Sequence, residues 1–220
     1  MIIQGQVGAP AQSFGPNSTP NIRQGQMGDI IVSELHGKWY ESAYRGNLYS
    51  VGMTSTALSA NTITLVAATT PIIGLWNPLT STVNCVLAKA KCLITSASSN
   101  AIAPGAFVWA TSTNNGAIST GLVPLNRKTL AQAGSQAKGF NISTALTGLT
   151  NNLVIQNAAG FGTLVCGQGA IPTTTFSGDA IEEFDGGLIV PPGGVIALIN
   201  TTSTTTVSVA SMLMWEEVPI

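Results

Sequence analysis

The sequence predicts an all-β protein, a jelly-roll-like β-sandwich of about eight strands that follows an extended N-terminal arm. From Val51 onward the chain is a series of short segments rich in Val, Ile, Thr and Leu, each bounded by Gly, Pro or Asn. Hydrophobic residues make up 45% of the chain, enough for a sizeable core, and only 8% of the residues are charged. We therefore expect an arm over residues 1–30, an aromatic-rich linker over 31–50 and a β domain over 51–220.

The predicted arm is rich in Gly, Pro, Gln and Asn and contains a short repeat: QGQVG at 4–8 recurs as QGQMG at 24–28. Such a segment buries too little apolar surface to fold alone, so we expect it to become ordered against a partner. The repeat is either chance recurrence in a biased segment or the sign of an arm that makes similar contacts twice. The second interpretation predicts interface positions at Gln4, Gln6, Gln24 and Gln26.

The segment LHGKWYESAYRGNLYS, residues 35–50, holds the only histidine, His36, and all three tyrosines of the chain. Ser33 is a candidate N-cap of a short helix, and Gly46 lies where that helix would end. Tyr, Trp and Arg side chains carry much of the binding energy at the centre of protein contacts. We therefore predict contact with another chain; the alternative is that the segment plugs one end of its own barrel. The predicted interface residues here are Trp39, Tyr40, Tyr44, Arg45 and Tyr49.

The predicted strands follow one another with turn residues between them. They lie within residues 56–70, 70–78, 84–97, 105–113, 116–126, 151–165, 185–202 and 204–220. In the last segment Val207, Val209, Ser211, Leu213 and Trp215 alternate and are expected to share one face. PPGG at 191–194 predicts a tight turn with a positive φ, which would join 188–190 to 195–199 as a hairpin. Residues 126–140 are predicted to be a long connection between strands. Eight strands with long crossing loops favour a jelly roll over an up-and-down barrel.

The charges are unevenly distributed, because no acidic residue occurs between Glu41 and Asp179 while six Lys and Arg residues do. Acids at the ends and cations in the middle suit contacts between subunits. A pI of about 5.7 argues against a nucleic-acid binder. Mean hydropathy is high, +0.34, yet no apolar run approaches the ~20 residues of a membrane-spanning helix. The N-terminus lacks the pattern of a signal peptide, so we expect a soluble protein made in the cytoplasm.

Catalytic and metal chemistry are disfavoured by the residue types present. A cupin-type metal site needs two or three histidines with a carboxylate, and this chain has one histidine. A hydrolytic triad needs a base beside its nucleophile, and no G-x-S-x-G sequence occurs. The glycine-rich segment 160–169 has no lysine and no helix pattern after it, unlike a phosphate-binding loop. We therefore expect no enzymatic activity and no cofactor.

Two other sets of residues, the cysteines and an acidic stretch, are candidates for chemistry. Cys85, Cys92 and Cys166 are odd in number and form no C-x-x-C pair; we interpret them as small buried hydrophobic residues. On a regular strand Cys85 and Cys92, seven residues apart, would face opposite sides. The acidic stretch 178–187 could supply oxygen ligands to Ca²⁺, or it could be a solvated turn or a patch for basic neighbours. Its carboxylates are Asp179, Glu182, Glu183 and Asp185.

Four segments resemble structural proteins of tailed bacteriophages: GAPAQSFGPN, ELHGKWYESAYRGN, VPPGG and WEEVPI. The family that the chain resembles is that of capsid decoration (cement) proteins. The resemblance implies a trimeric jelly roll on the outside of the head, tied to the major capsid protein by its arm, with no catalytic residues. The expected location is the virion surface, and the expected partners are other copies of the chain and the capsid protein. The alternative is the receptor-binding tip of a tail fibre or spike.

Overall fold

The structure is a computed structural model in which residues 5–6, 22–23, 37–52, 58–59, 71–97, 107–113, 121–141, 154–158, 178–200 and 207–220 are described. The chain divides into two compact units, Met1–Tyr40 and Glu41–Ile220. In the first unit β1 (Gly5–Gln6) and β2 (Ile22–Arg23) pair in parallel. The described part of the chain contains no helix that could span a membrane.

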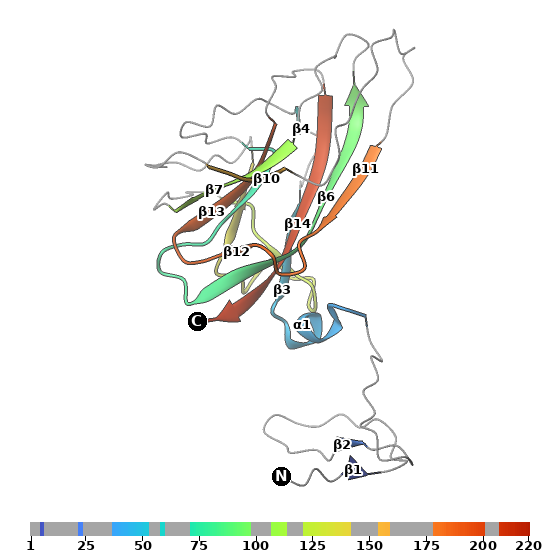
Figure 1. Cartoon of the computed structure of the whole chain (residues 1–220), viewed down its shortest axis with the longest axis vertical. Helices are drawn as coiled ribbons and strands as arrows, with labels where there is room; N and C mark the ends of the chain where they lie inside the picture. The colour runs from blue at the N-terminus through green and yellow to red at the C-terminus, as the bar shows by residue number, and fades with distance from the viewer. Residues whose placement is uncertain are drawn as a thin grey trace. The chain divides into compact units, whose positions relative to one another are not determined.

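The second unit contains two antiparallel sheets (Figure 1). The five-stranded sheet has the order β10 (Val154–Ala158), β7 (Phe107–Thr113), β13 (Gly194–Asn200), β5 (Ile73–Trp76) and β9 (Lys138–Phe140). The seven-stranded sheet has the order β11 (Gly178–Glu183), β6 (Val83–Ala97), β14 (Val207–Pro219), β3 (Leu48–Gly52) and β8 (Leu125–Asn126). It also includes β12 (Ile189–Val190), paired with β6, and β4 (Leu58–Ser59), paired with β14.

The main hydrophobic core lies between the two sheets. Leu75 and Trp109 reach it from the five-stranded sheet, and Leu213 and Trp215 reach it from the seven-stranded sheet; all four are fully buried. Because two sheets that bury one face each against the other form a sandwich, the predicted all-β sandwich is confirmed. The jelly-roll topology stays a prediction.

Strand β13 is buried on both of its faces. Ile196 and Leu198 belong to the core between the sheets, whereas Val195 and Ile199 belong to a second cluster on the other face. A strand that is covered on both sides needs apolar residues at successive positions instead of alternating ones. The sequence VIALI in β13 meets that requirement.

A β-bulge in β6 changes which side chains enter the core. Met214 is opposite Lys89 and Trp215 is opposite Leu87, so Ala88 is an extra residue on β6. An extra residue reverses the alternation of side chains beyond it. Cys85 and Cys92 therefore both lie in the main core, and the expectation that they face opposite sides was wrong. The prediction that they are small buried hydrophobic residues is confirmed for Cys85 and Cys92, whereas Cys166 lies outside the described residues.

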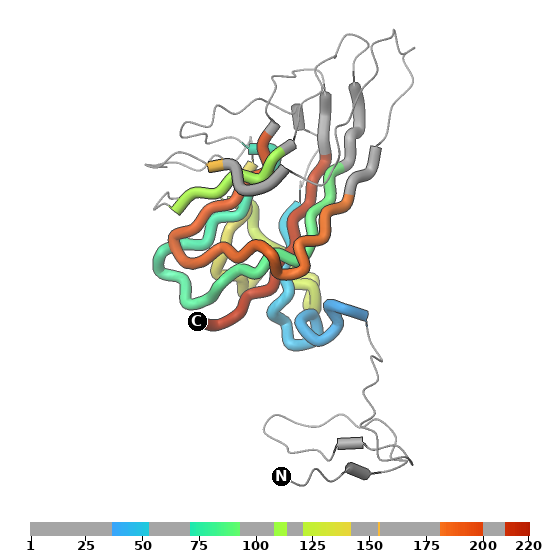
Figure 2. The backbone as a smooth tube through the Cα atoms, in the orientation of Figure 1, coloured from blue at the N-terminus to red at the C-terminus, as the bar shows by residue number. Residues whose placement is uncertain are grey.

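The PPGG turn is a corner between the two sheets. Gly194 donates its N–H to Pro191 O at 2.8 Å, and Gly193 has φ +78°, which matches the predicted tight turn with a positive φ. The predicted hairpin is wrong, because β12 pairs with β6 while β13 pairs with β5 and β7. Figure 2 shows the chain passing from one sheet to the other at this turn.

Asn77 fixes this corner from inside the protein. Its side-chain Nδ2 donates to Val83 O at 2.8 Å and to Val190 O at 3.0 Å. Its backbone N–H donates to Gly194 O at 3.0 Å, and its backbone carbonyl accepts from Gly193 N at 2.8 Å. One fully buried side chain thus connects the end of β5, the start of β6 and the turn.

The described residues form twelve strands in the two sheets, more than the eight or so predicted. Three of these strands lie in segments that the sequence did not predict to be strands. Strand β3 begins inside the predicted linker, β9 lies in the predicted connection, and β11 is formed by the acidic stretch. Each pairs with a strand distant in sequence, so local composition alone did not reveal them.

Candidate interaction surface

The aromatic segment forms a short helix, α1 (Tyr40–Arg45), that contains no buried residue. The helix ends at Gly46, where φ is +82° and the N–H donates to Ala43 O at 3.0 Å, as the sequence predicted. Arg45 Nε donates to Glu41 Oε1 at 2.8 Å, one turn away on the same face. The predicted N-cap, Ser33, lies outside the described residues.

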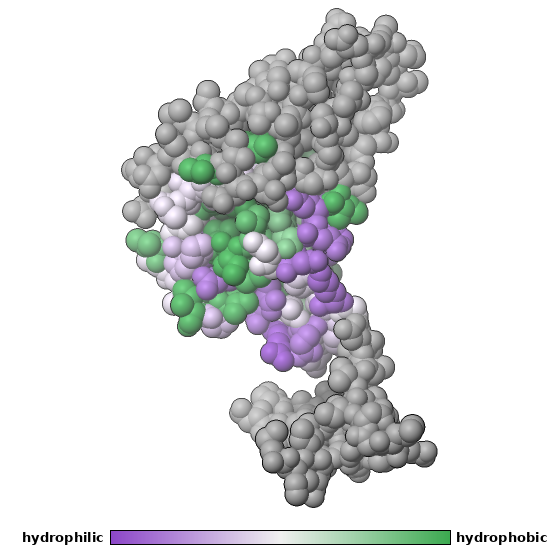
Figure 3. All heavy atoms as spheres, in the orientation of Figure 1, coloured by the Kyte–Doolittle hydropathy of each residue, from purple (hydrophilic) through white to green (hydrophobic). Residues whose placement is uncertain are grey.

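The predicted interface residues of this segment differ in their exposure. Tyr40 is 43% exposed and Tyr44 is 55% exposed, whereas Trp39 is half-buried in the turn before the helix. Arg45 is exposed. The helix therefore does not plug the sandwich, because none of its side chains enters a core. Figure 3 shows hydrophilic residues at the end of the sandwich where α1 lies in Figure 1.

Tyr49 was wrongly placed at the interface. Its side chain is only 7% exposed and belongs to the main core, where its ring stacks on that of Trp215. Burial raises the pKa of Tyr49 above its usual value of 10.0; the Asn126 side chain partly offsets this, and the negative charge of Glu217 adds to it. Tyr49 differs from Tyr44 because it lies on β3, whose alternate residues point into the sandwich.

The remaining predicted interface residues are in the N-terminal arm. Gln6 is the last residue of β1, and the next described residue is Ile22. Gln4, Gln24 and Gln26 lie outside the described residues, as does His36. The arm contacts therefore stay predictions.

The turn after β8 attaches to the end of α1. Asn126 Nδ2 donates to Gly46 O at 2.7 Å, and Lys128 Nζ lies 4.9 Å from the centre of the Tyr44 ring. A cation at this distance from an aromatic face is attracted by its quadrupole, worth about 0.5–1 kcal/mol at an exposed site. The turn and the helix thus form one surface on the second unit.

A buried carboxylate holds the segment before β9. Glu217 is 6% exposed and its Oε1 accepts hydrogen bonds from Ser135 Oγ at 2.5 Å and from Gln136 N at 3.1 Å. Trp215 Nε1 and Ala137 N also donate to this oxygen, both at 3.4 Å. A buried carboxylate with several donors is a structural anchor, and three of these donor residues, Ser135, Gln136 and Ala137, lie 80 or more positions away in the sequence. Burial raises the pKa of Cys85, and the negative charge of Glu217 raises it further.

The acidic stretch forms contacts within the chain. Trp109 Nε1 donates to Glu182 Oε2 at 2.6 Å, and Lys89 Nζ pairs with Glu183 Oε1 at 3.1 Å. Within the described ranges, no group of three or more His, Cys, Asp and Glu side chains is placed to hold a metal ion. In the Lys89–Glu183 pair, a cation from the middle of the sequence is neutralised by an acid from the C-terminal part of the same chain.

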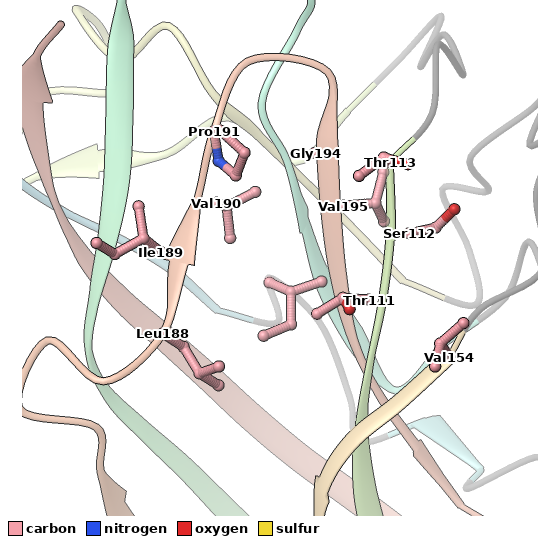
Figure 4. A pocket seen from close by; sticks show the side chains of 11 residues that line it. Thr111, Ser112, Thr113, Val154, Leu188, Ile189, Val190, Pro191, Gly194 and Val195 are labelled. Atoms are coloured by element: carbon pink, nitrogen blue, oxygen red, sulfur yellow. The ribbon is translucent and has the colours of Figure 1, made fainter.

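A cavity of about 450 Å³ opens between the segment that contains β12 and the strands β7, β10 and β13 of the five-stranded sheet (Figure 4). Leu188, Ile189 and Val190 line it from the seven-stranded side, and Thr111 and Val195 line it from the other. Its described lining contains no charged and no aromatic side chain, so it offers apolar contact and hydroxyl groups but no acid, base or strong nucleophile.

Sequence reasoning missed three polar residues that organise these features: Asn77, Asn126 and Glu217. Glu217 could have been found, because the alternation that places Leu213 and Trp215 inside also places Glu217 inside. Asn77 and Asn126 gave only the weak signal of an asparagine at the end of an apolar segment. Their partners come from distant parts of the chain, which a local pattern does not contain.

Comparison with protein-family models, curated proteins and solved structures found no match to this chain.

Proposed function

We propose that this chain is a structural virion protein of a tailed bacteriophage, a decoration protein that binds the outside of the capsid and stabilises the shell. The observation that carries the proposal is the position of the aromatic residues. Tyr40 and Tyr44 are exposed on a helix that packs no side chain into a core. Exposed aromatic residues beside cations are typical of the centre of protein–protein contacts.

Composition and sequence resemblance add support. Only 8% of the residues are charged, so few long side chains lose freedom when the subunit is covered by partners. The four segments that resemble phage decoration proteins include the one that forms α1. We propose a homotrimer as the bound form, with the major capsid protein as the second partner.

The proposal is tested by adding the purified chain to phage heads that lack it and imaging the particles. We expect new density on the shell and heads that resist heating better. Density on the tail, or no binding to heads, would overturn the proposal; density at the fibre tip would indicate the receptor-binding alternative. Deletion of residues 1–30 should abolish shell binding while the β domain still folds.

The trimer is tested separately by sedimentation equilibrium at micromolar concentration. We expect a species of three times the 22.5 kDa chain mass. A single species at the mass of one chain would contradict the trimer without affecting shell binding.

A further inference from the structure

The turn over residues 126–131 is held in one conformation by Asn126. Asn126 Oδ1 accepts from Lys128 N at 2.9 Å and from Thr129 N at 3.2 Å. The Asn126 backbone carbonyl accepts from Leu130 N, and its N–H donates to Ala131 O, both at 2.9 Å. With the bond to Gly46, these contacts fix the turn rigidly beside the end of α1.

Leu130 stands in this turn in an unusual conformation. Its φ is +58°, a left-handed backbone value that residues other than glycine rarely adopt. Its side chain is 68% exposed. The strain is not offset by burial in the core, since Leu130 belongs to neither core cluster. Strained residues that surrounding bonds hold in place are concentrated at binding sites.

The surface around Leu130 is positively charged. Arg127 and Lys128 are exposed, and neither forms an ion pair within the described part of the chain. Arg45, by contrast, is paired with Glu41. The exposed ring of Tyr44 lies under Lys128 Nζ, so aromatic, aliphatic and cationic groups meet at one place.

We propose that Tyr44, Arg127, Lys128 and Leu130 form a docking surface, the Asn126-turn surface, for an acidic face of another protein. Leu130 packs against an apolar side chain of that partner, and Arg127 and Lys128 pair with its carboxylates. Opposite charges at an interface fix its orientation and speed association. The partner is a protein because two cations on a chain of net charge −1 are too few to hold a nucleic acid.

The identification of this partner with the capsid protein rests on the proposed function, whereas the surface itself does not. Two binding probes test the identity of the partner and the existence of the surface separately. Heads that lack the chain test the first, and a short fluorescent peptide that contains glutamates and a leucine tests the second. If the wild-type chain fails to bind heads, the proposed function fails, and the peptide still decides whether the Asn126-turn surface exists.

The first variant is Leu130→Gly. Glycine adopts a positive φ without strain, so the melting temperature should stay equal or rise, while affinity for heads and for the peptide should fall about tenfold. Leu79→Ser removes another exposed leucine, far from Asn126 in the sequence, and should leave both affinities within about twofold. A fall in melting temperature with unchanged affinities would show a purely structural leucine and overturn the proposal.

The second variant is the double reversal Arg127→Glu with Lys128→Glu. We expect it to lose at least about tenfold in peptide affinity and to remove most of the salt dependence of binding. The matched control is Lys138→Glu, an exposed cation on β9, which should bind the peptide as the wild type does. If the double reversal and the Lys138→Glu control lost peptide affinity equally, a specific acidic protein partner would be contradicted. The same conclusion would follow if single-stranded DNA displaced the peptide as efficiently as unlabelled peptide does.

Discussion

The ring of Tyr49 stacks on the indole of Trp215, with the ring centroids 6.3 Å apart and 26° between the planes. The two residues are directly opposite each other on β3 and β14. Tyr49 therefore belongs to the structure of the sandwich, while Tyr44, five residues earlier, remains on its surface.

Replacing Tyr49 by alanine should lower the free energy of unfolding by about 3–5 kcal/mol, because it removes a large buried ring and leaves a cavity. Denaturant unfolding followed by tryptophan fluorescence measures this change. Tyr44→Ala is the matched control and should cost no more than about 1 kcal/mol, since the ring it removes is exposed and its contact with Lys128 is a surface cation–π contact. Equal losses in the two variants would contradict the difference in burial.

Glu217→Gln should destabilise the protein by about 2 kcal/mol. The amide keeps one oxygen for the Ser135 and Gln136 donors but turns an N–H₂ group toward a site built from donors, so a buried hydrogen bond is lost. Glu216→Gln, the neighbouring residue in β14, should change stability by less than about 0.5 kcal/mol. Hydrogen exchange of the 135–137 amides should quicken only in the Glu217 variant.

Stability should fall as the pH rises above about 9. Burial raises the pKa of Cys85 from its usual value of 9.0, and burial also raises that of Tyr49 from 10.0. The unfolded chain therefore releases these protons before the folded chain does, and each group contributes up to about 1.4 kcal/mol of loss per pH unit. Below pH 9 the stability that the two raised pKa values contribute is fully present.

The variant Tyr49→Phe should flatten the alkaline part of this curve, because it keeps the ring and removes the buried hydroxyl. Urea unfolding at several pH values between neutral and strongly alkaline measures the slope. An unchanged slope in Tyr49→Phe would show that Tyr49 does not contribute to alkaline unfolding.

Gly74→Ala should destabilise the sandwich by about 1–3 kcal/mol or more. A Cβ at this position would lie 2.4 Å from Phe140 Cζ and 2.9 Å from the backbone oxygen of Ile196, so the Phe140 ring on β9 and the backbone of β13 would both have to move. Gly37→Ala is the control, since no heavy atom of the described residues, its chain neighbours aside, lies within 4 Å of its added Cβ. Thermal melting of both variants distinguishes close packing from a general effect of losing a glycine.

Much of the second unit could be predicted from the sequence because its signals are local. The alternation in β14 placed Leu213 and Trp215 inside, Gly46 marked the end of α1, and PPGG marked a turn with a positive φ. Each of these depends on the side-chain period of a strand or on the freedom of glycine, which a few neighbouring residues determine.

Tertiary structure decided the features that depend on distant partners. The extra residue Ala88 turned Cys85 and Cys92 to the same face, and a bulge exists only against the strand it pairs with. Asn77 made the PPGG turn a corner between sheets, and Asn126 joined a turn to a helix 80 residues earlier. The sequence by itself determined that aromatic residues gather near residue 40. Only the pairing of β3 with β14 separated the buried Tyr49 from the exposed Tyr44, because burial is a property of the assembled sheets.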